Sequence, residues 1–527
     1  MQRLAFAIVT LFIIGCGGGE ESSKKTAHFD PIEASYSLQE RNSVITLKNR
    51  KDATLHIDLG STPKSLYVVT TSHFDNQQIT LNGSRSYRAV AKSNNNSSQP
   101  QKRGKEDSLK NRILTFNENT FKLLRIPDHS KDNTLYQQKE ARGVTQGRSE
   151  RFCVDMDSSY NCTRFINATA VRVKSGIATM QGDRDFVIWL EDGISIKSSA
   201  LNNLSDIFLK SGLDNDIYDW ETNIFSKEWG EDAQSIDSHL IGNDSTINIL
   251  VYDMHTSTMA GFFWPKDNFK KSYIAASNEK IMFYVSAALL NNDEKETFTT
   301  LDHEFQHMIH FYQRAVLKDI HDDTWFNEMM SEATEDLLAI KIGYKGPRNV
   351  DPNDGSAGPD NNRKGRYPSF NAHNTLALTN WSNSVANYGK VSAFGAFLNR
   401  NYGGASLLHR LMTSNKADRE ALEEATALDI HTLVNQWGIA VLLSDQTDIS
   451  GKLQYNKGGY FTNSYGDSSY QLGSINFFNY SPQPKLQNSA ILNDNANLYS
   501  KVGDGLSGTL ELHINIPKGA TISLIAK

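Results

Sequence analysis

Two histidines and a glutamate in the segment FTTLDHEFQHMIHFYQRAVL, residues 298–317, have a spacing that suits metal-assisted hydrolysis. Apolar residues recur in this segment at intervals of three and four, which predicts an amphipathic helix. His303 and His307 are four residues apart, so their imidazoles project from one face of that helix and can bind one cation, with zinc preferred. Glu304 follows the first histidine and lies beside the metal without binding it. There it can accept a proton from a water molecule whose pKa the metal lowers.

A catalytic zinc ion needs a third protein ligand, and the sequence offers one on a second predicted helix. The metzincin pattern is excluded, because it requires histidine at position 313 and glycine at position 310, where this chain has Gln313 and His310. The segment TWFNEMMSEATEDLLAI, residues 324–340, has a helical periodicity of its own. After a turn at residues 318–323, this helix can return alongside the first one and bring the carboxylate of Glu328 to the metal.

The two segments together resemble a known class of peptidases. HEFQH at residues 303–307, followed by NEMMSE at residues 327–332, is similar to the gluzincin arrangement of thermolysin-type zinc peptidases. The longer runs HEFQHMIHF and FNEMMSEATEDL are most similar to the hyicolysin family of secreted bacterial metallopeptidases. The resemblance covers residues 270–410, and it implies a two-lobed peptidase whose zinc, at the floor of a cleft, is bound by both histidines and Glu328. It also implies that Glu332, in place of the aspartate of thermolysin-type enzymes, hydrogen-bonds a histidine ligand.

Peptide hydrolysis requires one further hydrogen-bond donor, which stabilises the oxyanion of the tetrahedral intermediate. Gluzincins supply a tyrosine or a histidine that follows the third ligand. The candidates in this chain are Tyr388, which precedes a helix-like stretch, and His373. We favour Tyr388, and the alternative for each residue is a packing role alone.

The N-terminal sequence MQRLAFAIVTLFIIGC predicts export of the protein. Its apolar run from Leu4 to Ile14 is too short to span a bilayer as a mature helix. The ending Ile-Ile-Gly-Cys resembles the lipobox of bacterial lipoproteins, which implies removal of residues 1–15 and lipidation of Cys16. Residues 16–27 would then form a flexible tether. The expected location is the bacterial cell envelope, anchored at the outer membrane or cell surface, or the secreted fraction; an ordinary secretory signal and an uncleaved anchor are the alternatives.

Two cysteines remain in the mature chain, Cys153 and Cys162, nine positions apart between strand-like runs. An even pair in an exported protein predicts one disulfide that closes a hairpin loop, with two buried free thiols as the alternative. The sequence DPNDGSAGPDNN, residues 351–362, is rich in oxygen ligands and could bind calcium. A plain polar loop is the favoured interpretation of that segment.

Alternating and helical patterns divide the rest of the chain into units of an α+β multidomain protein. A polar stretch without periodicity separates the first unit from a region of strand signals, and helical periodicity begins with the zinc-binding segment. The predicted units are a β-sandwich-like module at 28–92, a linker at 93–113, a β-rich N-terminal lobe of the peptidase domain at 114–296, a helical zinc-binding lobe at 297–450 and a C-terminal β module at 451–527.

Composition limits the classes of function. The chain has 527 residues, 39% of them hydrophobic, and a formal net charge of -6, which indicates a globular protein and argues against a nucleic-acid partner. The sequence therefore predicts a zinc-dependent endopeptidase that acts on proteins or peptides. The alternative is a catalytically inactive surface binding protein or adhesin on the same scaffold, which the presence of all three ligands and the base argues against.

Overall fold

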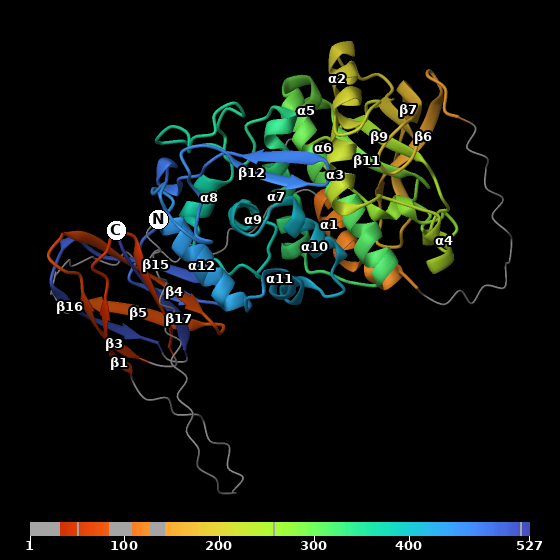
Figure 1. The fold of residues 1–527 in the computed structure, drawn as a ribbon. Helices are drawn as coiled ribbons and strands as arrows, with labels where there is room; N and C mark the ends of the chain where they lie inside the picture. The colour runs from red at the N-terminus through yellow and green to blue at the C-terminus, as the bar shows by residue number, and fades with distance from the viewer. Residues whose placement is uncertain (1–31, 50–51, 84–107, 126–142, 257–258, 517–518) are drawn as a thin grey trace, which may run out of the picture.

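The computed structural model describes residues 32–49, 52–83, 108–125, 143–256, 259–516 and 519–527. A β-sandwich lies at one end of the molecule, a lobe built on a mixed sheet lies at the other, and a helical lobe lies between them (Figure 1). The predicted α+β multidomain class is therefore confirmed. The predicted signal peptide, the tether with Cys16 and residues 93–107 of the predicted linker lie outside the described residues. Within the ranges given above, no helix is long and apolar enough to cross a membrane.

The sandwich is assembled from both ends of the chain. Its two sheets have the strand orders β1-β3-β16-β5-β14 and β15-β4-β17-β2. The late strands β16 and β17 each pair with early strands on both sides, and the core between the sheets includes Leu55 and Leu524. The strands are β1 (Ile32–Ser37), β2 (Ser43–Asn49), β3 (Ala53–Asp58), β4 (Lys64–Ser72), β5 (Gln77–Gly83), β14 (Ser489–Leu492), β15 (Asn497–Leu506), β16 (Thr509–Asn515) and β17 (Ala520–Ala526).

This arrangement corrects the prediction of two separate β modules at 28–92 and 451–527. Each end of the chain supplies only part of two sheets, and neither part could bury its apolar faces alone. The alternating pattern of a strand shows which face is buried but not which distant strand is its partner. The pair β12 (Phe461–Tyr465) and β13 (Ser468–Leu472), also in the predicted C-terminal module, instead packs against the helical lobe.

The mixed sheet of the second lobe has the order β10-β11-β9-β8-β7-β6. Strands β8, β9 and β11 are parallel, and β10 pairs antiparallel with β11 at the edge nearest the zinc-binding segment. Cys153 and Cys162, on β6 and β7, form a disulfide with an S–S distance of 2.06 Å. The elements are β6 (Ser149–Met156), β7 (Cys162–Ile177), β8 (Arg184–Glu191), β9 (Thr246–Tyr252), β10 (Gly261–Phe263), β11 (Ile281–Ser286), α2 (Ser198–Phe208), α3 (Ile217–Phe225), α4 (Asp232–Ile236) and α5 (Ala287–Asn292), with a 3₁₀ turn at Pro265–Asn268.

A helix, α1 (Ser108–Asn119), occupies the junction where the sequence predicts the end of a linker at residue 113 and the start of a strand-rich lobe. Leu109, Ile113 and Phe116 recur at helical spacing and are buried in the main core. The linker prediction is therefore corrected. The polar residues that precede this helix, together with its many polar positions, obscure its short apolar stripe in the sequence.

The helical lobe contains the segments predicted to bind zinc. Helix α6 begins at Glu294, and the side chain of Asp293 caps it by accepting the N–H of Glu296 at 3.0 Å. The turn predicted at 318–323 separates it from α7. The elements are α6 (Glu294–His310), a π-helical turn (Phe311–Val316), α7 (Thr324–Ile342), α8 (Tyr367–Ala372), α9 (Val385–Asn401), α10 (Ala405–Thr413), α11 (Asp418–Thr426) and α12 (Ile430–Leu442).

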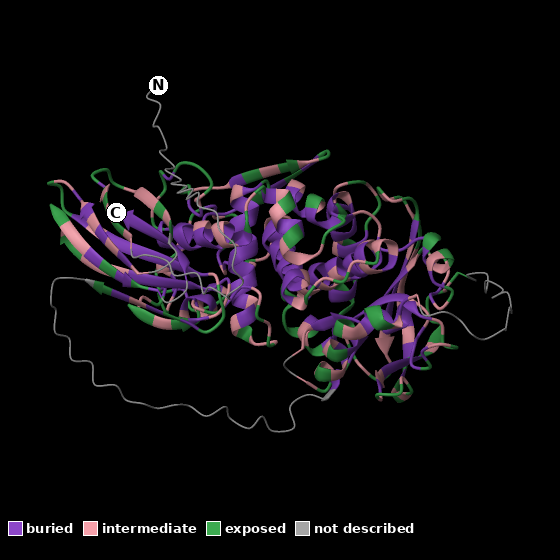
Figure 2. Cartoon of the chain, turned by 90° about the horizontal axis from the view of Figure 1, so that it is seen from below, coloured by how far each residue is buried: buried purple, intermediate pink, exposed green. Residues whose placement is uncertain are grey.

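Close packing of α9 on α7 depends on a glycine. A Cβ atom at Gly395 would lie 2.9 Å from the Cβ of Ala333, closer than such atoms approach in proteins. Glycine therefore allows α9 to lie against the helix that bears Glu328. One hydrophobic core extends from the mixed sheet through these helices to the base of the sandwich, and Figure 2 shows buried residues throughout this region.

The segment that follows β10 is held by a buried ion pair. The Lys266 ammonium lies 2.5 Å from Asp267 Oδ1 and donates to Ala276 O and to the Tyr284 hydroxyl. Tyr284 in turn donates to Asp267 Oδ2 at 2.6 Å, and Asn278 donates to the carbonyl of Cys153 at 3.0 Å. Since the groups are fully or almost fully buried, each depends on the others for its hydrogen bonds.

We expect Lys266→Met to lower the free energy of unfolding by about 3–5 kcal/mol, because it leaves the Asp267 carboxylate buried without a cation. The measurement is denaturant-induced unfolding followed by tryptophan fluorescence. Lys271→Met removes an exposed lysine from the same loop and should change stability by less than about 0.5 kcal/mol. Equal effects of the two substitutions would contradict a structural role for the buried pair.

Candidate metal centre and active-site cleft

The three predicted zinc ligands lie together where α6 and α7 face each other. His303 and His307 project from α6, and their Nε2 atoms are 3.1 Å apart. Glu328 projects from the first half of α7, and its Oε2 atom lies 3.2 Å from Nε2 of His303 and 3.7 Å from Nε2 of His307. The structure thus brings together, in one triangle of atoms, residues that the sequence separates by a turn.

Hydrogen bonds on the far side of each imidazole determine which nitrogen faces this triangle. Nδ1 of His303 lies 2.7 Å from a carboxylate oxygen of Glu335, and Nδ1 of His307 lies 3.0 Å from the amide oxygen of Asn327. Both partners are acceptors, so both Nδ1 atoms carry the proton and both Nε2 atoms present lone pairs. Oε2 of Glu328, which is buried, has no hydrogen-bond donor. Three lone pairs therefore converge on one point, an arrangement that requires a cation.

The size of the triangle matches zinc. Ligand atoms about 2.0–2.1 Å from a tetrahedral zinc ion lie roughly 3.3–3.4 Å from one another. The observed separations of 3.1, 3.2 and 3.7 Å bracket that value. Two imidazole nitrogens and one carboxylate oxygen are also the donor set of catalytic zinc sites, which leave a fourth position open.

The carboxylate that orients His303 is Glu335, which corrects the prediction of Glu332. Glu332 instead forms an ion pair with Arg366, with Nε–Oε2 and Nη2–Oε1 distances of 2.9 and 2.6 Å. Glu335 is seven residues after Glu328 and therefore on the same face of α7, toward α6. His303, Glu332 and Glu335 form a second acidic group of the kind that can bind a cation, and the guanidinium of Arg366 supplies the positive charge there.

The electrostatics of the site favour positive charge between the helices. Burial alone would lower the pKa of His303, but the neighbouring carboxylates of Glu328 and Glu335 outweigh burial and raise that pKa well above its ordinary value. Burial would raise the pKa of Glu328, whereas its contacts with His303 and His307 hold that pKa well below the usual range. The site therefore favours anionic Glu328 and a positive charge at the imidazoles, which a metal ion can provide.

Glu304 is oriented by the edge strand of the sheet lobe. The backbone N–H of Phe263 on β10 donates to Glu304 Oε2 at 2.9 Å. The carboxylate is half-buried beside the two histidines and makes no contact that would identify it as a ligand. Burial raises its pKa, and the adjacent imidazoles partly offset this effect. A carboxylate in this position can take a proton from a water molecule in the cleft.

Of the two oxyanion candidates, the structure brings only Tyr388 to the metal ligands. Tyr388 lies in the first turn of α9, and its hydroxyl donates to Glu328 Oε1 at 3.3 Å. Burial, and then the negative charge of Glu328, raise the pKa of Tyr388 well above its ordinary value, so the hydroxyl remains a donor. His373 is exposed, lies outside the cleft lining and bonds the carbonyl of Ser369.

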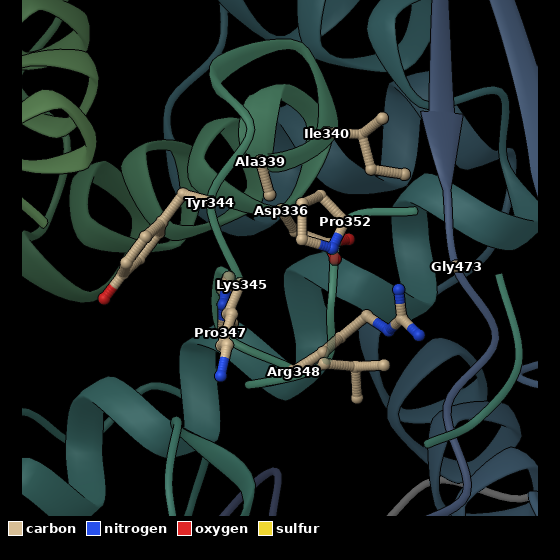
Figure 3. Close-up of a pocket in the computed structure, with 10 residues that line it drawn as sticks. Asp336, Ala339, Ile340, Tyr344, Lys345, Pro347, Arg348, Pro352 and Gly473 are labelled. Atoms are coloured by element: carbon tan, nitrogen blue, oxygen red, sulfur yellow. The ribbon is translucent and has the colours of Figure 1, made fainter. Parts of the chain in front are cut away.

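The metal ligands lie in a cleft of about 950 Å³. Its lining comes from α1, β10, α6, α7, the loop at 343–353 and the start of α9. A separate hollow of about 10 Å³ lies behind the C-terminal end of α7, beside Asp336 and Arg348 (Figure 3). That hollow has room for about one water molecule, so the cleft is the candidate substrate site.

Comparison with known proteins agrees with this geometry. Residues 169–527, well over half of the chain, match the family described as Peptidase M30. The chain belongs to the Peptidase M30 family. A 115-residue segment is also 30% identical to the neutral metalloprotease ShpI of Staphylococcus hyicus, covering 19% of this chain and 26% of that protein. The chain thus spans about a quarter of the length of this curated relative.

The M30 match includes helices α6 and α7 and strand β10, but α1 and strands β1–β6 lie outside it. Several of the residues that complete the site have weak sequence signals. Asn327 stands in the NEMMSE motif, and helical spacing could have identified Glu335. Arg366 and the N–H of Phe263 come from separate loops and strands, and nothing near them in the sequence points to the metal.

Calcium binding at residues 351–362 stays a prediction. Carboxylates of Asp351 and Asp354 accept backbone N–H groups of their own loop at 2.9 and 2.8 Å. The guanidinium of Arg348 donates to the carbonyls of Asp354 and Ser356. Several of the oxygen atoms in this loop thus already have donors.

We expect Glu335→Gln to weaken zinc binding about 10- to 100-fold, because it weakens the hydrogen bond that fixes the tautomer and orientation of His303. The affinity is measured by competition with a chromophoric chelator, with circular dichroism to confirm folding. Glu332→Gln is the matched control and should have a smaller effect. A larger loss with Glu332→Gln would restore the assignment suggested by the sequence.

Proposed function

We propose that this member of the M30 family is a zinc-dependent endopeptidase that hydrolyses proteins or peptides. The observation that carries the proposal is the convergence of His303 Nε2, His307 Nε2 and Glu328 Oε2, at separations suited to zinc, on the wall of a large cleft. Glu304, beside these atoms, supports hydrolysis over a structural metal site, because a structural site needs no base.

The bound zinc would act as a Lewis acid that polarises the substrate carbonyl and lowers the pKa of water. Glu304 removes a proton from the attacking water and later delivers it to the leaving amine. The N–H of Phe263 holds one oxygen of this carboxylate, which leaves the other oxygen to exchange the proton. Tyr388 donates a hydrogen bond to the oxyanion that forms on the carbonyl.

The edge strand supports an extended peptide as the substrate. Strand β10 ends its sheet and lines the cleft beside Glu304. A sheet edge can bind an extended chain through main-chain hydrogen bonds, which are independent of the peptide's sequence. The N–H and C=O of Phe263 already bond Glu304 and Asn117, so the part of β10 before Phe263 would make these bonds. The lining continues past the metal ligands to the loop at 343–353, so peptide residues on both sides of the cleaved bond have room.

The proposal includes a location in the bacterial cell envelope, through lipid on Cys16. It is supported by the sequence of residues 1–16 alone. An inactive binding protein or adhesin is the alternative function, and the intact base and ligands argue against it.

We expect Glu304→Gln to abolish peptide cleavage while it leaves zinc content at one ion per chain, because the residue moves protons and does not bind the metal. Cleavage of a mixed peptide library is followed by mass spectrometry, and zinc is measured by atomic absorption. His303→Ala is the comparison variant and should lose both zinc and cleavage. A wild-type protein that contains stoichiometric zinc and cuts no peptide would favour the binding-protein alternative.

We expect Tyr388→Phe to lower kcat about 10²- to 10³-fold with little change in KM, because the lost donor acts mainly in the transition state. The measurement is steady-state hydrolysis of a fluorogenic peptide cut by the wild type. His373→Phe, which alters the other sequence candidate, should leave kcat within about twofold. A larger effect of His373→Phe would reverse the assignment of the two residues.

A further inference from the structure

Helix α1 presents three different faces. One face is buried in the core of the protein, and a second face lies in solvent. The third face forms part of the lining of the metal-binding cleft. The core face consists of Leu109, Ile113 and Phe116, of which Ile113 also reaches the cleft lining. The solvent face consists of Asn111, Thr115 and Glu118. The cleft face consists of Lys110, Leu114 and Asn117. The cleft-facing residues are spaced four and three apart, so they form one continuous stripe.

The helix is a fixed wall of the cleft. Arg112 donates to both carboxylate oxygens of Asp155, at 2.8 and 2.6 Å. The ring of Phe116 meets the indole of Trp264 edge-on, with 6.4 Å between centroids. Asn117 Nδ2 donates to the carbonyl of Phe263, the residue whose N–H orients Glu304, at 3.2 Å. Because of these contacts the stripe has a defined position relative to the base.

Lys110 gives the stripe one positive charge that no described carboxylate balances. The ammonium of Lys110 forms no ion pair or hydrogen bond with the part of the chain that the structure describes. Lys110 is seven residues from Asn117, or about 10 Å along the helix, which is roughly the length of three residues of an extended peptide. Asn117 contacts Phe263, the residue that orients the base, so Lys110 lies about 10 Å along the helix from that contact.

We propose that the stripe formed by Lys110, Leu114 and Asn117 is a substrate-recognition surface, which selects peptides that carry an acidic side chain about three residues from the cleaved bond. Lys110 attracts the carboxylate of the peptide's acidic residue. Leu114 provides an apolar contact for the peptide residues between that acidic residue and the metal. The inference rests on the proposed function and names the substrate class. Helix α1 lies outside residues 169–527, so the family match does not include this surface.

The test uses pairs of peptides, called twins, that are identical except at one position, where one twin has Glu and the other has Lys. The varied position lies up to four residues on either side of a cleavage site. Their affinities are measured by fluorescence anisotropy on the zinc-loaded full chain bearing Glu304→Gln, so that binding is observed without turnover. We expect the Glu twin to bind about five- to tenfold more tightly at one position, and this ratio to fall toward one in high salt.

Lys110→Glu should abolish or invert that preference. Thr115→Glu is the matched control, because it adds a negative charge to the solvent face of the same helix, and it should keep the wild-type ratio. A ratio of one at every position, no peptide binding at all, or equal effects of the two substitutions would overturn the inference. Circular dichroism of both variants verifies that α1 stays folded.

Cleavage of the same peptides by the chain with native Glu304 separates this inference from the proposed function. Charge-dependent binding without cleavage would refute the peptidase assignment and leave the recognition surface intact. Cleavage of both twins at equal rates would refute the recognition surface and leave the peptidase assignment intact.

Discussion

Four carboxylates concentrated around two imidazoles are the constraint on which the rest of the site depends. Glu328, Glu332 and Glu335 are buried, and Glu304 is half-buried. Charges in such a place are costly unless cations and hydrogen bonds balance them. Arg366 balances Glu332 at one end of the group. At the other end Tyr388 donates to Glu328 Oε1, but Glu328 Oε2 has no donor and faces the lone pairs of two histidines. A metal ion between these atoms would balance the remaining negative charge.

The surrounding fold fixes the positions of the helices that carry these side chains and of the strand that orients Glu304. Asp322, next to the start of α7, accepts hydrogen bonds from Arg314 and from His310, the latter at 2.9 Å. These bonds fix the turn between α6 and α7. Gly395 lets α9 approach α7 and so brings the Tyr388 hydroxyl to Glu328. On the other side, the buried network around Lys266 secures the segment after β10. The geometry of the base thus depends on the sheet lobe, and that of the ligands on the helical lobe.

The sequence predicts those parts of the site that depend on local spacing. The two histidines, the base and Glu328 follow from helical periodicity and one short turn. The choice between Glu332 and Glu335 depends on how α7 is rotated against α6, which packing decides and spacing alone does not. Arg366 reaches the site from beyond a loop of more than twenty residues, so it left no local pattern. The sequence predicts two separate β modules in place of the one sandwich for the same reason, because strand pairing between distant segments has no signature within either segment.

The sandwich also limits the order in which the parts of the protein can fold. Strand β17 lies between β2 and β4, so two of the first strands to be synthesised keep open hydrogen-bonding edges until one of the last arrives. The sheet lobe and the helical lobe are each nearly continuous in sequence, so they can fold earlier. Strand pairs between segments so far apart in the sequence form slowly. Helix α12 packs against β4 and β17, so the face of α12 that they cover stays exposed until β17 has joined the sheet. A chain that ends shortly before β16 could therefore form the metal site but would keep an unfinished, aggregation-prone sheet.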